Sequence, residues 1–217
     1  MTTQLDLKEI ERKAFRATYQ DGLWDMYLGV VIAAMAIFVY RPEDGYHPAN
    51  IVLAITAIGL AYSLFWAGKR FITLPRMGQV RFGLQRKRRK VTLALILGAV
   101  VLVQVGIVSL SVLGWLNPAV GAQINALIGD RDVMDLVVAS IGALFVGPSM
   151  VLMAYFNDFP RGYYIAIMMS LAVFLMIWLN QPIYPIIIGG LIVLPGLVLF
   201  VRFLQKHPLR RDEAIYG

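Results

Sequence analysis

Carboxylates and arginines are the side chains of this sequence best able to do chemistry. Asp21 and Asp25 stand four residues apart, so they would share one face of a helix. Arg76 belongs to a second polar stretch, and its guanidinium can form a bidentate pair with a carboxylate or a phosphate. Such groups, gathered at a membrane surface, could bind an anion or act on a lipid headgroup. The full candidate cluster is Asp21, Asp25, Arg76, Arg81, Asn157, Asp158 and Arg161.

The same side chains have a structural alternative. Helix caps, interfacial anchors and ion pairs between helices are made by the same residue types. The sequence favours this structural role and leaves the functional role open. Convergence of the three segments on one cytosolic site is therefore a prediction about where a function would lie.

Other reaction chemistry finds little support. The chain has no cysteine, which excludes disulfides, thiolate nucleophiles and thiolate metal sites. Its two histidines, His47 and His207, fall on opposite sides of the membrane in the topology derived below, so they cannot share a metal ion. The sequence has no P-loop, HExxH or Gly-x-Ser-x-Gly motif. We predict no enzyme, no metal and no cofactor, with a lipid-modifying site at the inner face as the one enzymatic alternative.

The elements that must position these residues are membrane helices. Hydrophobic residues make up 59% of the chain and charged residues 15%, against about 45–50% and about 25% in a soluble domain. A helix needs about 20 mostly apolar residues to cross hydrocarbon. We predict an all-α polytopic membrane protein with six transmembrane helices within residues 23–204. The predicted spans are 23–40, 48–67, 91–113, 133–156, 162–180 and 182–204.

The charge distribution predicts which way the spans face. With the N-terminus in the cytosol, every Lys and Arg except Arg41 and Arg131 falls in a cytosolic segment, as the positive-inside rule requires. Both termini are then cytosolic. Residues 1–22 are predicted to form an amphipathic surface helix and residues 205–217 a tail. The cell (plasma) membrane, as a prokaryotic inner membrane, is the expected location.

A basic cytosolic loop over residues 68–90 is the strongest concentration of charge. Its last five residues immediately precede the third span, where each attraction to an anionic headgroup is worth about 1 kcal/mol. We expect binding of anionic lipid or of an acidic partner, and the alternative is a purely topological role. Nucleic acid is not an expected partner, because the charges lie against the membrane and no recognition motif accompanies them. The five residues are Arg86, Lys87, Arg88, Arg89 and Lys90.

The earlier part of this loop has a strand-like composition. β-branched and aromatic residues flank Pro75-Arg76-Met77-Gly78, which favours a short hairpin over residues 71–82. Pro75 would preset one corner of the turn, and Gly78 could take a positive φ. Arg76 would then lie at the tip.

A few residues interrupt the apolar spans. Gln104 is the only strongly polar side chain of the third span, and a buried glutamine more often ties helices together than binds a substrate. Gly147-Pro148 interrupts the fourth span, and Pro195-Gly196 interrupts the sixth. Broken helices build binding sites in some transporters, although Gly and Pro more often permit kinks and close packing.

Two further features concern packing. Gly29 and Ala33 form a small-residue face that would suit a neighbouring helix of the chain or of a homo-oligomer. The outer segment 114–132 has apolar residues at helical spacing, which favours a short surface helix.

Two short motifs are similar to those of a known group of proteins. Residues 19–25 match Tyr-x-Asp-Gly-Leu-x-Asp, and residues 75–80 match Pro-Arg-x-Gly-x-Val. In both, the chain resembles a family of small uncharacterised prokaryotic multi-pass membrane proteins. The resemblance implies that the two motifs belong together and supplies no activity or substrate.

The expected function is that of a non-catalytic membrane protein whose inner face engages anionic lipid or a regulatory partner. The alternative is a small oligomeric transporter or channel for ions or small solutes, which the interrupted spans and Gln104 motivate.

Overall fold

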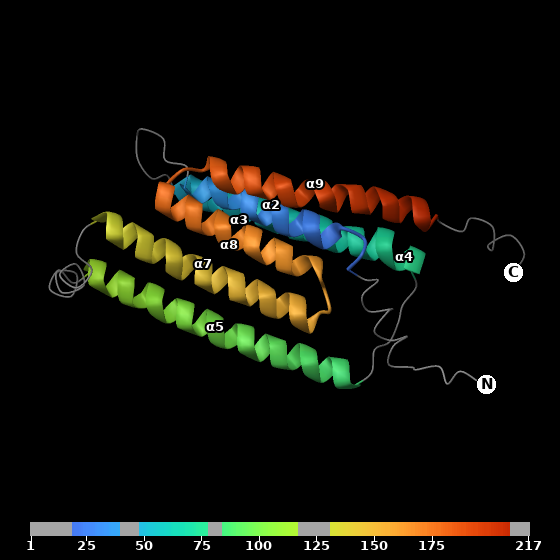
Figure 1. The fold of residues 1–217 in the computed structure, drawn as a ribbon, viewed down its shortest axis with the longest axis horizontal. Coiled ribbons are helices and arrows are strands. Elements are labelled where there is room, and N and C mark those ends of the chain that lie inside the picture. Colours follow the sequence, from blue (N-terminus) through green and yellow to red (C-terminus); the bar gives the residue numbers. More distant parts are fainter. Residues whose placement is uncertain (1–18, 40–47, 78–83, 117–130, 209–217) are drawn as a thin grey trace, which may run out of the picture. The chain divides into compact units, whose positions relative to one another are not determined.

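The structure is a computed structural model that describes residues 19–39, 48–77, 84–116 and 131–208. In these residues the fold is all-α and consists mainly of six long helices (Figure 1). Each predicted span coincides with one of them, so the predicted all-α fold with six helices is confirmed. The long helices are α2 (Leu23–Val39), α3 (Pro48–Ala67), α5 (Leu84–Leu116), α7 (Arg131–Phe156), α8 (Arg161–Leu179) and α9 (Ile183–Lys206).

Four helical segments are long and apolar enough to cross a membrane. They are Ala49–Met77, Asp135–Phe156, Arg161–Leu179 and Ile183–Lys206. Shorter apolar stretches, Leu23–Ile37 and Val91–Gly106, lie in α2 and α5. Large apolar side chains such as Leu64, Leu102 and Ile167 are mostly exposed, which suits a hydrocarbon surrounding rather than water.

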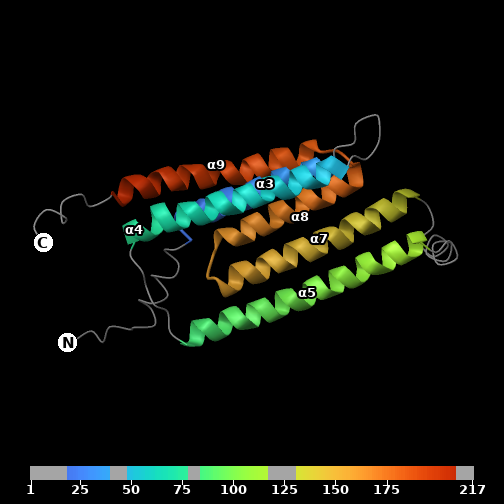
Figure 2. The same cartoon turned by 180° about the vertical axis from the view of Figure 1, so that it is seen from behind.

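The chain divides into two compact units. Unit 1 comprises residues 1–82 and 185–217, so it contains α2, α3 and nearly all of α9. Unit 2 comprises residues 83–184 and contains α5, α7 and α8. Unit 1 is thus assembled from two stretches that are far apart in the sequence. Figure 2 shows α3 and α9 of unit 1 from the side opposite to Figure 1.

Glycines bring α2 and α9 into backbone contact in unit 1. A Cβ added at Gly29 would lie 2.7 Å from the carbonyl oxygen of Gly189, and one added at Gly189 would lie 2.6 Å from that of Gly29. One added at Gly196 would lie 2.8 Å from the Cβ of Asp25. Only glycine fits at such distances. The small-residue face of Gly29 and Ala33 therefore packs inside the chain and is not open to a second copy.

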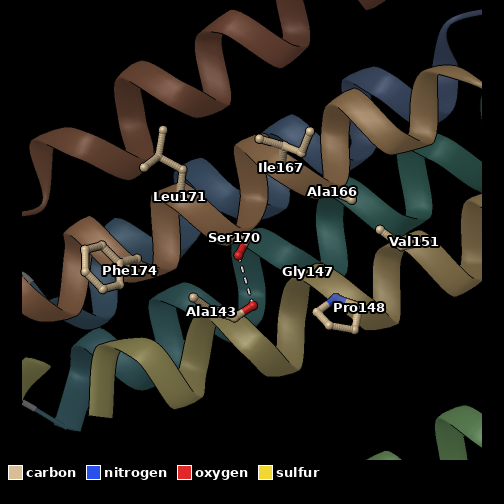
Figure 3. A pocket seen from close by; sticks show the side chains of 9 residues that line it. All are labelled: Ala143, Gly147, Pro148, Val151, Ala166, Ile167, Ser170, Leu171 and Phe174. Atoms are coloured by element: carbon tan, nitrogen blue, oxygen red, sulfur yellow. Dashed lines mark hydrogen bonds between the residues drawn. The ribbon is translucent and has the colours of Figure 1, made fainter. Parts of the chain in front are cut away.

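A side-chain hydrogen bond joins α7 and α8 in unit 2. The hydroxyl of Ser170 in α8 donates to the carbonyl oxygen of Ala143 in α7 at 3.0 Å (Figure 3). Gly147 makes room for this contact, since a Cβ there would lie 3.1 Å from the Ser170 hydroxyl. Pro148 follows directly and has no N–H to donate within α7. A hydroxyl from a neighbouring helix is a usual partner for backbone near such a proline.

The helices that hold these Gly-Pro and Pro-Gly pairs are not broken. α7 is continuous through Gly147-Pro148, and α9 is continuous through Pro195-Gly196. The broken helices of the transporter alternative are therefore not seen, and the favoured expectation of close packing agrees with the structure. In each helix, close contacts at a glycine show that packing between helices accounts for that residue.

The predicted hairpin is also wrong in the part that the structure describes. Gly68–Thr73 form a π-helical segment, η1, and Leu74–Met77 form a short α-helix, α4, so the chain stays helical beyond α3. The Leu74 N–H donates to the carbonyl oxygen of Lys69, five residues back. Pro75 is the second residue of α4 and has no N–H to donate to the helical turn before it.

Several predictions fall outside the described residues. They concern residues 1–18 of the expected surface helix, the side chain of Arg81, the outer segment 117–130 and the tail from residue 209 onward.

Candidate functional site

Asp21 lies fully buried at the start of α2 in unit 1, with 0% of its surface exposed. Its Oδ1 accepts a hydrogen bond from the Leu23 N–H at 3.3 Å, which satisfies a donor that the first turn of the helix leaves open. Gly22 between them has a φ of +75°, which glycine adopts without strain. The turn Asp21-Gly22 therefore sets where α2 begins.

The second oxygen of Asp21 connects α2 to η1. Its Oδ2 accepts hydrogen bonds from Lys69 Nζ and from Thr73 Oγ1, both at 2.7 Å. Lys69 and Thr73 are four residues apart in one helical segment, so one carboxylate can reach both. The Lys69 side chain is 20% exposed. We name this group of Asp21, Lys69 and Thr73 the α2–η1 lock.

Aromatic rings surround the lock on the side of α3. The rings of Trp24 and Phe65 lie 4.6 Å apart between centroids, and those of Tyr27 and Phe65 lie 5.1 Å apart. Lys69 Nζ is 5.8 Å from the centroid of the Phe65 ring. Phe65 therefore lies within cation–π range of Lys69, and Trp24 and Tyr27 of α2 pack against Phe65.

Asp25 also lies in unit 1 and is 3% exposed. Its charge attracts Lys69, as that of Asp21 does. Asp21 and Asp25 do not share a helix face as predicted, because Asp21 precedes the first helical residue, Leu23. One lysine nevertheless attracts both carboxylates.

Arg76 in α4 is not part of the lock. Its Nη1 donates to the carbonyl oxygen of Ile72 at 3.1 Å. Its Nε is buried and donates to no acceptor among the described residues. Arg76 therefore keeps an unused, buried donor on a charged side chain, whereas Lys69 is held by Asp21.

Asn157, Asp158 and Arg161 belong to unit 2, where they form the turn between α7 and α8. The Phe159 N–H donates to the carbonyl oxygen of Ala154 at 2.9 Å, and the Asp158 N–H donates to that of Tyr155 at 3.2 Å. Asp158 has a φ of +50°. This pair of bonds around a left-handed residue is the Schellman arrangement that closes a helix.

Side chains complete this cap. Asn157 Nδ2 donates to the carbonyl oxygen of Met153 at 2.8 Å. The Arg161 guanidinium lies 5.6 Å from the centroid of the Phe159 ring. In unit 2 the predicted cluster is therefore a helix-capping turn.

The predicted polar cluster thus resolves into separate local structures. Unit 1 brings Asp21 and Asp25 together near Lys69, and unit 2 holds Asn157, Asp158 and Arg161 in a turn. Convergence of all three segments stays a prediction. Sequence reasoning missed Lys69 and Thr73 as partners of Asp21. The available signal was their i, i+4 spacing just after the second predicted span, on the same predicted side of the membrane as the acidic motif that opens the first span.

The basic residues 86–90 lie in the first turns of α5. Helix α5 begins at Leu84, so these positions are helical and continue without a break into the apolar stretch Val91–Gly106. Arg88 is exposed, and its carbonyl oxygen accepts a hydrogen bond from Thr92 Oγ1 at 3.1 Å. The side chains of Arg86, Lys87, Arg89 and Lys90 lie outside the described part of the structure.

Gln104 is partly exposed on α5 and makes no hydrogen bond to another described residue. It lines neither the groove between α7 and α8 nor the groove between α2 and α3. Among the described residues it therefore does not tie helices together by a hydrogen bond.

The groove in unit 2 lies between α7 and α8 and has a volume of about 560 Å³ (Figure 3). No charged side chain lines it, and its Ser170 hydroxyl already donates to Ala143. Its apolar walls, formed by residues such as Val151, Ile167 and Phe174, suit hydrocarbon and not an ion.

Comparison with known protein families, with curated proteins and with solved structures finds no match to this chain.

Proposed function

We propose that this chain is a non-catalytic integral membrane protein whose inner face engages anionic lipid. The observation that supports this most strongly is the construction of α5. One uninterrupted helix carries five basic residues, 86–90, and then the apolar stretch Val91–Gly106. A basic segment joined to a membrane helix in this way lies at headgroup depth when the apolar stretch lies in hydrocarbon.

The helical form of the segment favours lipid over a protein partner. Successive helix positions turn by about 100°, so five consecutive positions encircle the helix axis. A protein that docks on one side would meet only some of them. A headgroup layer surrounds the helix and meets all of them.

The proposal includes six crossings, with both termini in the cytosol of a prokaryotic cell and the inner membrane as location. In unit 1 the charge of the described residues supports this orientation. Lys69, Arg70 and Arg76 follow α3, and Arg202 and Lys206 end α9. The opposite ends of α2, α3 and α9 carry no charged residue in their described parts.

The two features that favoured the transporter alternative, broken helices and Gln104, do not support it in the described residues. α7 and α9 run as continuous helices, and Gln104 faces neither described groove. No catalytic role is proposed for Asp21, because both of its oxygens accept hydrogen bonds inside a buried lock.

Replacing all five basic residues of 86–90 by glutamine tests the proposal. The protein is extracted together with its surrounding lipid in polymer discs, and the ratio of phosphatidylglycerol to phosphatidylethanolamine is measured by mass spectrometry. We expect wild-type discs to be enriched in phosphatidylglycerol over the bulk membrane. The variant should lose most of that enrichment, since each basic residue contributes about 1 kcal/mol of attraction.

The matched control replaces Arg202 and Lys206 by glutamine, because both are exposed basic residues on another helix of the same predicted face. Enrichment should persist there. Equal enrichment in the wild type and the five-residue variant, with orientation intact, would refute the proposal and leave residues 86–90 with a topological role alone.

A further inference from the structure

An apolar groove of about 400 Å³ lies between α2 and the α3–η1 helix in unit 1. Met26, Tyr27 and Val30 line it from α2, and Leu64 and Ile72 are among the residues that line it from the other side. This volume lies within the range of ligand sites, about 300–1,000 Å³. Leu64 is 72% exposed, so the wall of the groove is incomplete within this fold.

Arg76 stands next to the η1 end of this groove. It is four residues after Ile72, so it lies on the same side of the helix one turn further along. Its Nη1 donates to the Ile72 carbonyl at 3.1 Å, so its guanidinium lies beside the Ile72 backbone. Its buried Nε lacks an acceptor among the described residues. Arg76 forms no ion pair with a carboxylate among the described residues, so the charge of its guanidinium remains available to an anion.

We propose that this groove binds one anionic phospholipid, with an acyl chain between α2 and α3 and the phosphate on Arg76. The apolar lining matches hydrocarbon, and the positive guanidinium of Arg76 matches a phosphate. The other nearby cations are already engaged: Lys69 pairs with Asp21, and the Arg70 guanidinium lies 5.2 Å from the centroid of the exposed Trp66 ring. Charge complementarity therefore assigns the headgroup to Arg76.

This inference goes beyond the proposed function. Residues 86–90 would attract a layer of anionic lipid, whereas the groove would hold a single molecule at a defined place. The two can fail separately, because one depends on α5 and the other on Arg76.

Native mass spectrometry of the detergent-purified chain with added phosphatidylglycerol tests the site. We expect one retained phosphatidylglycerol per wild-type chain and a loss of affinity of about tenfold or more in Arg76→Gln. Arg70→Gln is the matched control, since it removes an arginine of the same helical segment that is not at the groove, and its affinity should stay unchanged. Phosphatidylcholine should be retained more weakly than phosphatidylglycerol.

A second variant keeps the test decisive if Arg76→Gln does not fold. Val30→Phe fills the groove and leaves Arg76 in place, so it should also release the lipid. Val52→Phe adds the same bulk at an exposed position outside the groove and should not. Equal retention by wild type, Arg76→Gln and Val30→Phe would overturn the inference. Retention lost on neutralising residues 86–90, and kept in Arg76→Gln, would overturn it too and assign the lipid to α5.

Discussion

Asp21 shows how one buried carboxylate can serve two structural tasks. One oxygen fixes the first turn of α2, and the other binds Lys69 and Thr73 of η1. Because Asp21 is fully buried, loss of its charge would leave Lys69 in a low-dielectric site with one hydrogen-bonding partner fewer. The residue therefore matters most for stability.

Asp21→Asn should destabilise the chain by on the order of 3 kcal/mol, because it breaks a buried ion pair and leaves a charge behind. Unfolding by dodecyl sulfate in mixed micelles, followed by circular dichroism, measures the change. Asp135→Asn is the matched control, since Asp135 is exposed on α7, and it should have little effect.

A double-mutant cycle separates the ion pair from other effects of the substitution. Asp21→Asn combined with Lys69→Met should be less destabilising than the sum of the two single changes, because the second change removes the unpaired charge. Additive free energies would show that Asp21 and Lys69 do not interact.

The spacing of Lys69 and Thr73 marks them as neighbours on one helix, but the local sequence does not identify Asp21 as their partner. Asp21 and Lys69 are 48 residues apart, and Asp21 and Thr73 are 52 apart. Only the packing of α2 beside the end of α3 brings them together. The cap at Asn157 and Asp158 depends on neighbours within five residues, so a capping role was predictable there.

At the scale of helices, glycine decides how closely α2 and α9 approach. Gly189 and its neighbour Gly190 offer a direct comparison, because a Cβ at Gly189 would press on the backbone of α2 while one at Gly190 would meet nothing within 4 Å. Gly189→Ala should therefore cost on the order of 2 kcal/mol through overpacking. Gly190→Ala should be neutral or stabilising by up to about 1 kcal/mol, as alanine favours helix. Chemical unfolding of both variants in parallel measures the difference, and equal stabilities would exclude a tight α2–α9 contact.

Removing the hydrogen bond between α7 and α8 should lower the stability by less than Gly189→Ala does. Ser170→Ala removes the bond to Ala143 and should cost about 0.6 kcal/mol, the average found for such bonds between membrane helices. Ser140→Ala is the control, because Ser140 donates only to Leu136 of its own helix. Thermal melting in detergent compares the two, and a larger loss for Ser140→Ala would contradict the assignment.

The helices themselves followed from the length of the apolar runs, because a run of about 20 such residues has few alternatives to a membrane helix. The helical form of residues 68–77 did not follow, since their local composition favours strand, and the contact of η1 with Asp21 is not visible in the local sequence. Likewise, Pro148 and Pro195 suggest helix breaks when only the local sequence is considered, yet α7 and α9 are continuous through them.

At the scale of the whole molecule, the proposed orientation can be tested by labelling single cysteines, because the chain has none of its own. A single cysteine at His47 should react with a membrane-impermeant maleimide added outside intact cells, and one at His207 should not. The five-residue variant of 86–90 should keep this pattern, because the remaining Lys and Arg are still concentrated on the inner side. Labelling at His207 alone would reverse the proposed topology.

Unit 1 joins the first two long helices of the chain to the last one. During synthesis, α2 and α3 emerge early, and the α2–η1 lock can close as soon as Thr73 is available. The glycine face of α2 has to wait for α9, while all of unit 2 is made in between. Until α9 is made, Gly29 of α2 lacks the helix that it contacts in the finished fold.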